Sequence, residues 1–582
     1  MRLTMKTKMI FFSMILTVLL SSAGQLTAQA LRGPLVVSSN WPECTNLTTW
    51  TRDVLRLDGV ENASETRQGI SVYTWLRLFN RVSVGGMQHY WEGPPGDEKY
   101  GLDAHKHLFV YGWGYCDTHC RIFESLWHEW TGDSTSAYRV CYKLGGRKNA
   151  FHTVYRVRLD GNYGAFDPRF GIYLLDHDSP DGRVLDWPEV GDDANILRNE
   201  RYVNRCQPFF EYPVTERPYT MALEKTYFDS EKQWEAAGGK DNQPYTSLRH
   251  EMGDVLHDMG WKLPRGMKIE RFWNNRGRKF YNALKTLNRP LDKVHSSGRF
   301  FRVTDKMFDS NYEKNDPNYV RMEAYLETVP RDEGYPKEMV GGRTIGQAWG
   351  ILEYTAPLGG SGYSDAVSSN TGMLHCQSVP YLRPVSRRSP TEVVFDFYCP
   401  FVLIDGVFRG ELCAPHPQDR VSVEFRALYP KPNNRDDAEE WTDWIEIAKG
   451  AGSFEKTLGR DEYKPECPAT VHGKYRFQIR VRAYAAENPA SVGLSDMSLK
   501  CHFENGIMSI PRLARGTNEI TFKVADQAAL NSPVKVTYRY NTSDGEKTHC
   551  QTLEQTDFIN NQATYLIEAK DLLRSNSLMI EY

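Results

Sequence analysis

The sequence lacks a second long apolar run, a basic block and an acidic tail. After the first 30 residues, no stretch of the 582-residue chain is apolar for long enough to cross a bilayer. The formal net charge is only −3, with both signs mixed along the chain. These absences exclude an integral membrane segment after residue 30, and they give no electrostatic footprint for nucleic acid.

The first 30 residues have the three parts of a secretory signal peptide. Basic residues open the chain, an apolar run extends from Met9 to Leu20, and the segment ends in Ala28-Gln29-Ala30. The run is too short for a retained membrane span. We therefore expect a secreted or periplasmic protein whose mature chain begins near Leu31.

Cysteine is scarce, with eleven residues in the whole chain. In an oxidising compartment some of these thiols are expected to pair. The odd total leaves at least one thiol unpaired unless it bonds to another chain. The composition is thus consistent with one reactive cysteine and up to five disulfide bridges.

The chain is too long for one hydrophobic core, so two to four domains are expected. Helical spacing predicts helices within 64–83 and over 116–131, followed by a strand near 136–146 and a hairpin over 151–168. From about residue 265 the pattern is that of short strands at sandwich-like spacing. These strands are predicted within residues 391–412, 420–430, 441–450, 473–485, 518–527 and 532–547.

The candidate chemistry lies in the stretch "YGWGYCDTHC", residues 111–120. Cys116 stands at the predicted helix start, where unpaired backbone N–H groups favour a thiolate. Cys120 stands one turn later on the apolar side, where a small buried residue is expected. A thiol nucleophile also needs a base, and that base needs an orienting group.

His152 and Asp167 supply such a pair on the two arms of the predicted hairpin. If Asp160-Gly161 forms a two-residue turn, Leu159 pairs with Asn162, and Asp167 lies opposite Val154. His152 and Asp167 then share one face of the sheet as diagonal neighbours. A three-residue loop would place them on opposite faces, so the pairing requires an even loop.

"GYC" at a helix start, followed by "FHTVYRVRLDGNYGAFDP", resembles the transglutaminase-like superfamily. The spacings of thirty-six (152 − 116) and fifteen (167 − 152) residues support this, and the resemblance covers about residues 65–175. It implies a papain-like α+β fold with Cys116 as nucleophile, His152 as base and acid, and Asp167 as the orienting group. Gln88, His89 and Trp91 are candidates for substrate contact or for the second oxyanion donor.

The predicted fold class is therefore an α+β papain/transglutaminase-like N-terminal domain followed by all-β, β-sandwich C-terminal domains. The expected parts are a signal peptide, a catalytic domain, a β-rich middle region, a β-sandwich and a small C-terminal β domain, over residues 1–30, 31–262, 263–384, 385–500 and 501–582.

The leading function is a cysteine-dependent amide hydrolase or acyl transferase that acts on an extracellular peptide or glycan-linked polymer. One alternative is a carbohydrate-active enzyme, such as a polysaccharide lyase, in which tyrosine or histidine moves the proton. Another alternative is a catalytically silent adhesion or carbohydrate-binding protein. No cofactor and no metal is predicted, because the possible ligands His119, Cys120 and His128 share one helix with Cys116 and no second cluster matches them.

Overall fold

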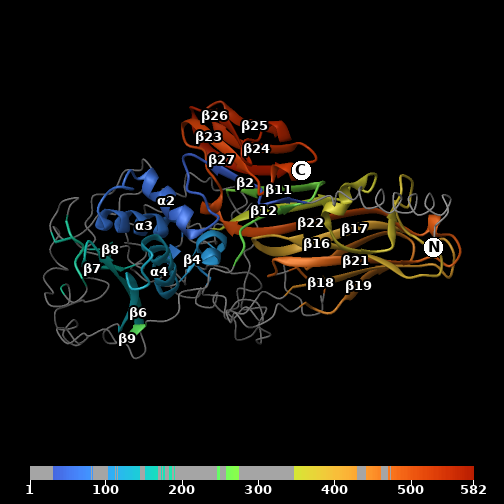
Figure 1. Ribbon diagram of the computed structural model, residues 1–582, viewed down its shortest axis with the longest axis horizontal. Coiled ribbons are helices and arrows are strands. Elements are labelled where there is room, and N and C mark those ends of the chain that lie inside the picture. The colour runs from blue at the N-terminus through green and yellow to red at the C-terminus, as the bar shows by residue number, and fades with distance from the viewer. Residues whose placement is uncertain are drawn as a thin grey trace, which may run out of the picture.

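A computed structural model shows a helical region at one end of the molecule and two β-rich bodies beside it (Figure 1). The structure describes residues 30–79, 81–82, 103–111, 113–114, 116–143, 151–167, 172–173, 175–176, 182–186, 189, 246–248, 257–273, 347–428, 441–459, 469–471 and 473–582. Within these ranges no helix is long and apolar enough to cross a membrane.

In the N-terminal region, three α-helices lie beside a five-stranded antiparallel sheet in the order β8-β7-β6-β5-β9. The helices are α2 (Leu47–Leu57), α3 (Glu65–Phe79) and α4 (Cys116–Thr131). The strands are β5 (Ala137–Lys143), β6 (Phe151–Leu159), β7 (Asn162–Asp167), β8 (Ile172–Tyr173) and β9 (Thr246–Leu248). Both helices and the strand and hairpin predicted in this region are confirmed.

Two further elements of this region were not predicted from the sequence. Helix α2 starts after Asn46, whose side chain accepts a hydrogen bond from the backbone N–H of Thr49 at 2.8 Å. A π-helix, η2 (Lys106–Tyr111), lies between the short parallel strands β3 (Arg81–Val82) and β4 (Trp113–Gly114) in the chain.

The rest of the described chain is almost entirely β, which confirms the prediction of a mostly β protein with β-sandwich domains. A five-stranded sheet has the order β13-β16-β21-β18-β19. Its strands are β13 (Val367–Thr371), β16 (Thr391–Tyr398), β18 (Arg420–Ala427), β19 (Ile445–Lys449) and β21 (Arg476–Tyr484). These segments form strands because their apolar residues alternate with polar ones. In β21, residues 477, 479, 481 and 483 are buried, while Arg476, Arg480 and Arg482 face outward.

A ten-stranded sheet covers the inner face of this first sheet, and the rings of Tyr354 and Phe397 meet between them at 5.2 Å. Its central path is β14-β15-β22-β12-β11-β27-β24-β25, and β17 joins β20 to β22. The strands are β11 (Met267–Phe272), β12 (Gln347–Thr355), β14 (Met373–His375), β15 (Leu382–Pro384), β17 (Val402–Cys413), β20 (Gly452–Thr457), β22 (Gly493–Gly506), β24 (Val534–Thr542), β25 (Gly545–Leu553) and β27 (Leu572–Glu581).

This sheet crosses the domain limits expected from the sequence. The limit after residue 500 falls inside β22, which pairs with both β12 and β17. Strand β11, from the expected middle region, lies between β12 and the last strand, β27. Middle and C-terminal segments therefore share one hydrogen-bonded sheet.

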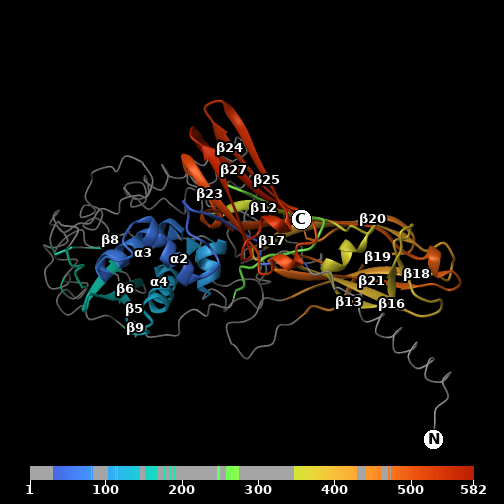
Figure 2. The ribbon, with the colours of Figure 1, turned by 45° about the horizontal axis from the view of Figure 1, so that its top comes forward.

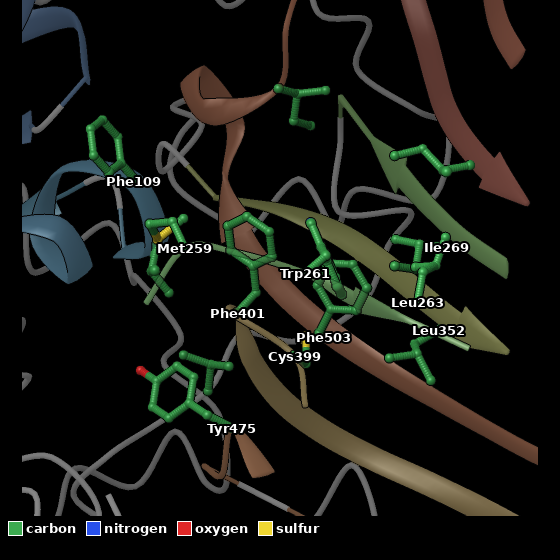
Figure 3. Packing of buried hydrophobic residues seen from close by; sticks show 14 of the residues in the cluster. Phe109, Met259, Trp261, Leu263, Ile269, Leu352, Cys399, Phe401, Tyr475 and Phe503 are labelled. Atoms are coloured by element: carbon green, nitrogen blue, oxygen red, sulfur yellow. The ribbon is translucent and has the colours of Figure 1, made fainter. Parts of the chain in front are cut away.

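The N-terminal segment is also built into the C-terminal part of the molecule (Figure 2). Strand β1 (Leu31–Arg32) pairs with β10 (Lys262–Leu263). Strand β2 (Leu35–Ser38) pairs with β23 (Gly516–Lys523), which in turn pairs with β26 (Gln562–Ala569). The hydrophobic core continues through the junction, where Trp261, Phe401 and Phe503 pack together (Figure 3).

The cysteines differ from the expectation of up to five bridges. Seven of them have described side chains, and none of these seven forms a disulfide. The other four of the eleven therefore allow two bridges at most within one chain. The seven are Cys44, Cys120, Cys376, Cys399, Cys413, Cys501 and Cys550.

Candidate active site

Helix α4 begins at Cys116, the residue at which the sequence predicts a helix start. It ends before Gly132, which adopts a φ of +69° and donates from its N–H to the carbonyl of His128 at 2.9 Å. The ring of Phe123 stacks on that of Tyr155 in β6, with centroids 4.4 Å apart. The side of α4 that carries Cys120 and Phe123 is therefore the side that faces the sheet.

The first turn of α4 lies beside the start of β6. The Sγ of Cys120 is 3.6 Å from the carbonyl oxygen of Thr153. Cys116 stands four residues earlier, which is about 6 Å along a helix axis. Two strand residues span about the same distance, so the helix start is level with the end of β6 that carries His152.

The hairpin has the register that the candidate pair requires. Leu159 pairs with Asn162 across a two-residue turn in which Asp160 has a φ of 50° and Gly161 a φ of 84°. Positive φ at both positions is the signature of the tight hairpin turn expected for Asp-Gly. The loop is thus even, and His152 and Asp167 occupy positions on the same sheet face.

A capping contact fixes this turn to helix α3. The Asp160 carboxylate accepts hydrogen bonds from the backbone N–H groups of Glu65 and Thr66, each at 3.0 Å. In return, the N–H of Asp160 donates to the Glu65 carboxylate at 2.7 Å. The hairpin end and the N-terminus of α3 therefore satisfy each other's polar groups.

The face shared by His152 and Asp167 is the one that points away from α4. Arg156 and Tyr163 lie on it, and the guanidinium is 4.9 Å from the ring centroid. Tyr155 and Phe166, on the other face, pack with Phe123. The backbone positions of Cys116 and His152 lie where α4 and β6 begin, at one end of the sheet. For Cys116, His152 and Asp167 the structure describes backbone positions alone.

Charged groups around the site are paired. On the face of His152 and Asp167, Arg156 donates to both carboxylate oxygens of Asp186. On the helix side, the buried Arg139 of β5 donates to Glu124 of α4 at 3.1 Å, which ties α4 to the sheet. Burial lowers the pKa of His128, and its Nε2 is 2.8 Å from the carbonyl of Ala137.

The three side chains of α4 that the sequence offers as possible metal ligands make packing and backbone contacts. His119 stacks on Tyr155 with centroids 6.2 Å apart, and Cys120 and His128 contact backbone carbonyls. Across the described part of the chain, no group of three or more potential ligand side chains could hold a metal ion. Gln88, His89 and Trp91 lie in residues 83–100, outside the described ranges.

Sequence reasoning missed the buried polar cluster just before the candidate nucleophile. His105 and His107 are both buried, the first just before η2 and the second within it. Asp103 accepts hydrogen bonds from the N–H groups of Lys106 at 3.0 Å and His257 at 2.9 Å. Asp103 three residues before Lys106 is a capping pattern that the sequence does contain.

Comparisons with known proteins identify no family. No protein-family model matches the chain, and no curated protein matches it. A candidate β-galactosidase from Bacteroides fragilis is 11% identical over 33% of this chain and 27% of its own length, with a TM-score of 0.11. An allantoicase is 12% identical over 37% of this chain and 80% of its own, with a TM-score of 0.15. A Bacteroides uniformis β-glucuronidase 3 is 10% identical over 31% and 22%, with a TM-score of 0.10. Likenesses this weak carry no argument about fold or function.

Proposed function

We propose that this protein is an exported cysteine-dependent amide hydrolase or acyl transferase with a papain-like, transglutaminase-like N-terminal domain. The observation that carries the proposal is the start of α4 at Cys116, level with the first residues of β6. The even β6–β7 turn adds support, because it gives His152 and Asp167 the same sheet face.

In the proposed mechanism, His152 takes the proton of the Cys116 thiol, and the sulfur attacks the carbonyl carbon of an amide. The oxyanion is held by the backbone N–H of Cys116 and one further donor. His152 then returns the proton to the leaving amine as the C–N bond breaks, which leaves a thioester on the enzyme. Water attacks the thioester, His152 takes its proton, and the acid and the free thiol are released. Asp167 orients the imidazole throughout.

Hydrolysis is favoured over transfer, since water is the default acceptor unless a site excludes it. The proposed substrate is an extracellular peptide or glycan-linked polymer. Export is supported by the predicted signal peptide, whose cleavage site directly precedes β1. Leu31, the first residue of the expected mature chain, is fully buried against Leu263.

The test is amine release from mixed peptide and glycopeptide polymers by the wild-type protein and by two serine variants. Cys116→Ser should lower the rate by at least about a thousandfold, because a serine here has no lowered pKa. Cys120→Ser is the matched control, one turn away on the same helix, and should keep most of the activity. Equal rates for the wild type and Cys116→Ser would contradict the proposal.

A carbohydrate-active enzyme is the second candidate, and one observation favours it. His502 and Asp405 form a pair across β22 and β17, with Nδ1 and Oδ1 2.5 Å apart. The ring of Trp349 lies 5.2 Å from the imidazole, and the histidine side chain is 15% exposed. A carboxylate-held imidazole beside an indole is suited to proton transfer on a sugar. Polysaccharide cleavage that survives Cys116→Ser but is lost in His502→Asn would establish this alternative.

A further inference from the structure

Arg271, in β11, is a buried guanidinium whose described partners are all neutral. The residue is 8% exposed. Its Nε donates to the side-chain oxygen of Asn505 and its Nη2 to the hydroxyl of Ser509, both at 2.7 Å. The guanidinium carbon lies 4.4 Å from the centroid of the Phe401 ring.

No carboxylate compensates this charge among the described residues. The groups that act on Arg271 electrostatically are Cys44, Cys399 and Tyr538. Burial raises the pKa of each of them, so all three are neutral at pH 7. Burial also lowers the pKa of Arg271 to about 10, which still leaves the side chain protonated at neutral pH.

Two neighbouring arginines have carboxylate partners, in contrast to Arg271. Arg265, just before β11, makes two hydrogen bonds to the Asp365 carboxylate at 2.7 and 2.9 Å. Arg539 on β24 donates to Glu270 at 2.9 Å. Buried charges in proteins are normally paired in this way, because an isolated ion loses its hydration without compensation.

Arg271 and Ser509 line a cavity of about 40 Å³ beneath strand β2. A water molecule needs roughly 10–15 Å³ by the same measure, so the space fits an ion the size of chloride or formate. The walls include Trp261, Ile269 and Phe401, which lie around this junction in Figure 3. Glu43 also lines the cavity, but its carboxylate is bound by Lys523 at 2.8 Å and by the hydroxyl of Thr45 at 2.7 Å.

We propose that this cavity binds one small monovalent anion, a halide or a carboxylate, through the guanidinium of Arg271, which Ser509 positions by accepting from Nη2 while its own hydroxyl donates to the carbonyl of Gly506. The anion supplies the charge that the described protein groups do not. Because the cavity is walled by β2, β11 and β27, a bound anion stabilises the junction between the N-terminal strand and the C-terminal sheet. This site is independent of the proposed thiol chemistry.

The test measures the unfolding of the full chain as bulky gluconate is replaced by chloride or by formate at constant ionic strength. At ten times the dissociation constant, the anion should lower the unfolding equilibrium constant of the wild type about tenfold. Arg271→Met should abolish this effect, and neutral formamide should not produce it. The matched control is Arg265→Met, which removes a paired guanidinium and should keep the anion effect. A response to chloride alone, to formate alone or to both identifies the class of anion and supports the site.

If Arg271→Met does not fold, two further measurements test anion binding in the cavity. Chloride NMR line widths should broaden in the presence of the wild-type protein and narrow again when formate is added. Ser509→Ala keeps the charge but removes the hydroxyl that positions the guanidinium, and it should weaken the anion effect. The proposal would be overturned if the wild type and Arg271→Met showed equal anion effects. It would also be overturned if the wild type and Ser509→Ala showed equal anion effects and the wild type did not broaden the chloride line.

Discussion

At the scale of single residues, the buried pair of Arg139 and Glu124 links α4 to its sheet. Their side chains are 0% and 4% exposed. We expect Arg139→Met to destabilise the N-terminal region by about 3–5 kcal/mol, because it removes one partner of a buried ion pair. Arg409→Met, which breaks an exposed pair with Glu455, should cost less than about 1 kcal/mol. Denaturant unfolding of both variants checks this, and equal losses would contradict it.

His257 gives a residue-scale prediction about pH. Its ring packs on Tyr475 at 4.8 Å, and burial together with Lys106 lowers its pKa from 6.5 to about 4. Between those values the unfolded chain takes up a proton that the folded protein does not, so stability falls as the pH drops from about 6.5 toward 4. The loss is up to about 3 kcal/mol at the lower end, and no dependence from this group is expected above pH 7.

Melting temperatures between pH 4 and 8 test this dependence. His257→Gln should flatten the curve between pH 4 and 6.5. The control His416→Gln changes a more exposed histidine and should leave the wild-type curve intact. The same steep fall in all three proteins would show that other groups cause it.

At the scale of elements, the β6–β7 turn sets which face His152 and Asp167 occupy. One glycine inserted after Gly161 would make the loop odd and move Asp167 to the face opposite His152. We expect this insertion to abolish thiol-dependent activity while the sheet remains folded, as measured by circular dichroism and amine release. Gly161→Ala is the control, since it strains a residue at a φ of 84° by about 1–2 kcal/mol but keeps the register. Activity retained by the insertion variant would count against the proposed triad.

The same hairpin shows what the sequence can predict. Helix α4, the Asp160-Gly161 turn and the strands of β16, β18 and β21 follow from local periodicity and turn chemistry, which nearby residues determine. Helix α2 was missed because threonines at its start weaken the helical pattern, while its stability comes from burial of Trp50 and Val54. The π-helix η2 was missed because part of its support comes from far along the chain: Asp103 accepts from the N–H of Lys106 and also from the N–H of His257.

At the scale of the whole molecule, the first strands join parts of the chain that no local pattern connects. Strand β2 pairs with β23 across nearly the full length of the sequence, and the Arg271 cavity depends on the same assembly. Sequence periodicity carries no information about such pairing, which is why the expected limit at residue 500 falls within β22. We expect deletion of residues 31–38 to expose Phe522 and to lower the melting temperature of the C-terminal sheet by several degrees. An unchanged melting temperature in calorimetry would show that this pairing contributes nothing to stability.

The central claim is an activated thiol at Cys116, and the most direct measurement is its alkylation by iodoacetamide between pH 5 and 8, followed by mass spectrometry of the labelled peptides. Cys550, an exposed thiol of the same chain, is the internal reference. At pH 6 Cys116 should react at least about tenfold faster than Cys550, and His152→Ala should remove this advantage. Cys116 labelling no faster than Cys550 at every pH, or unchanged by His152→Ala, would contradict the account.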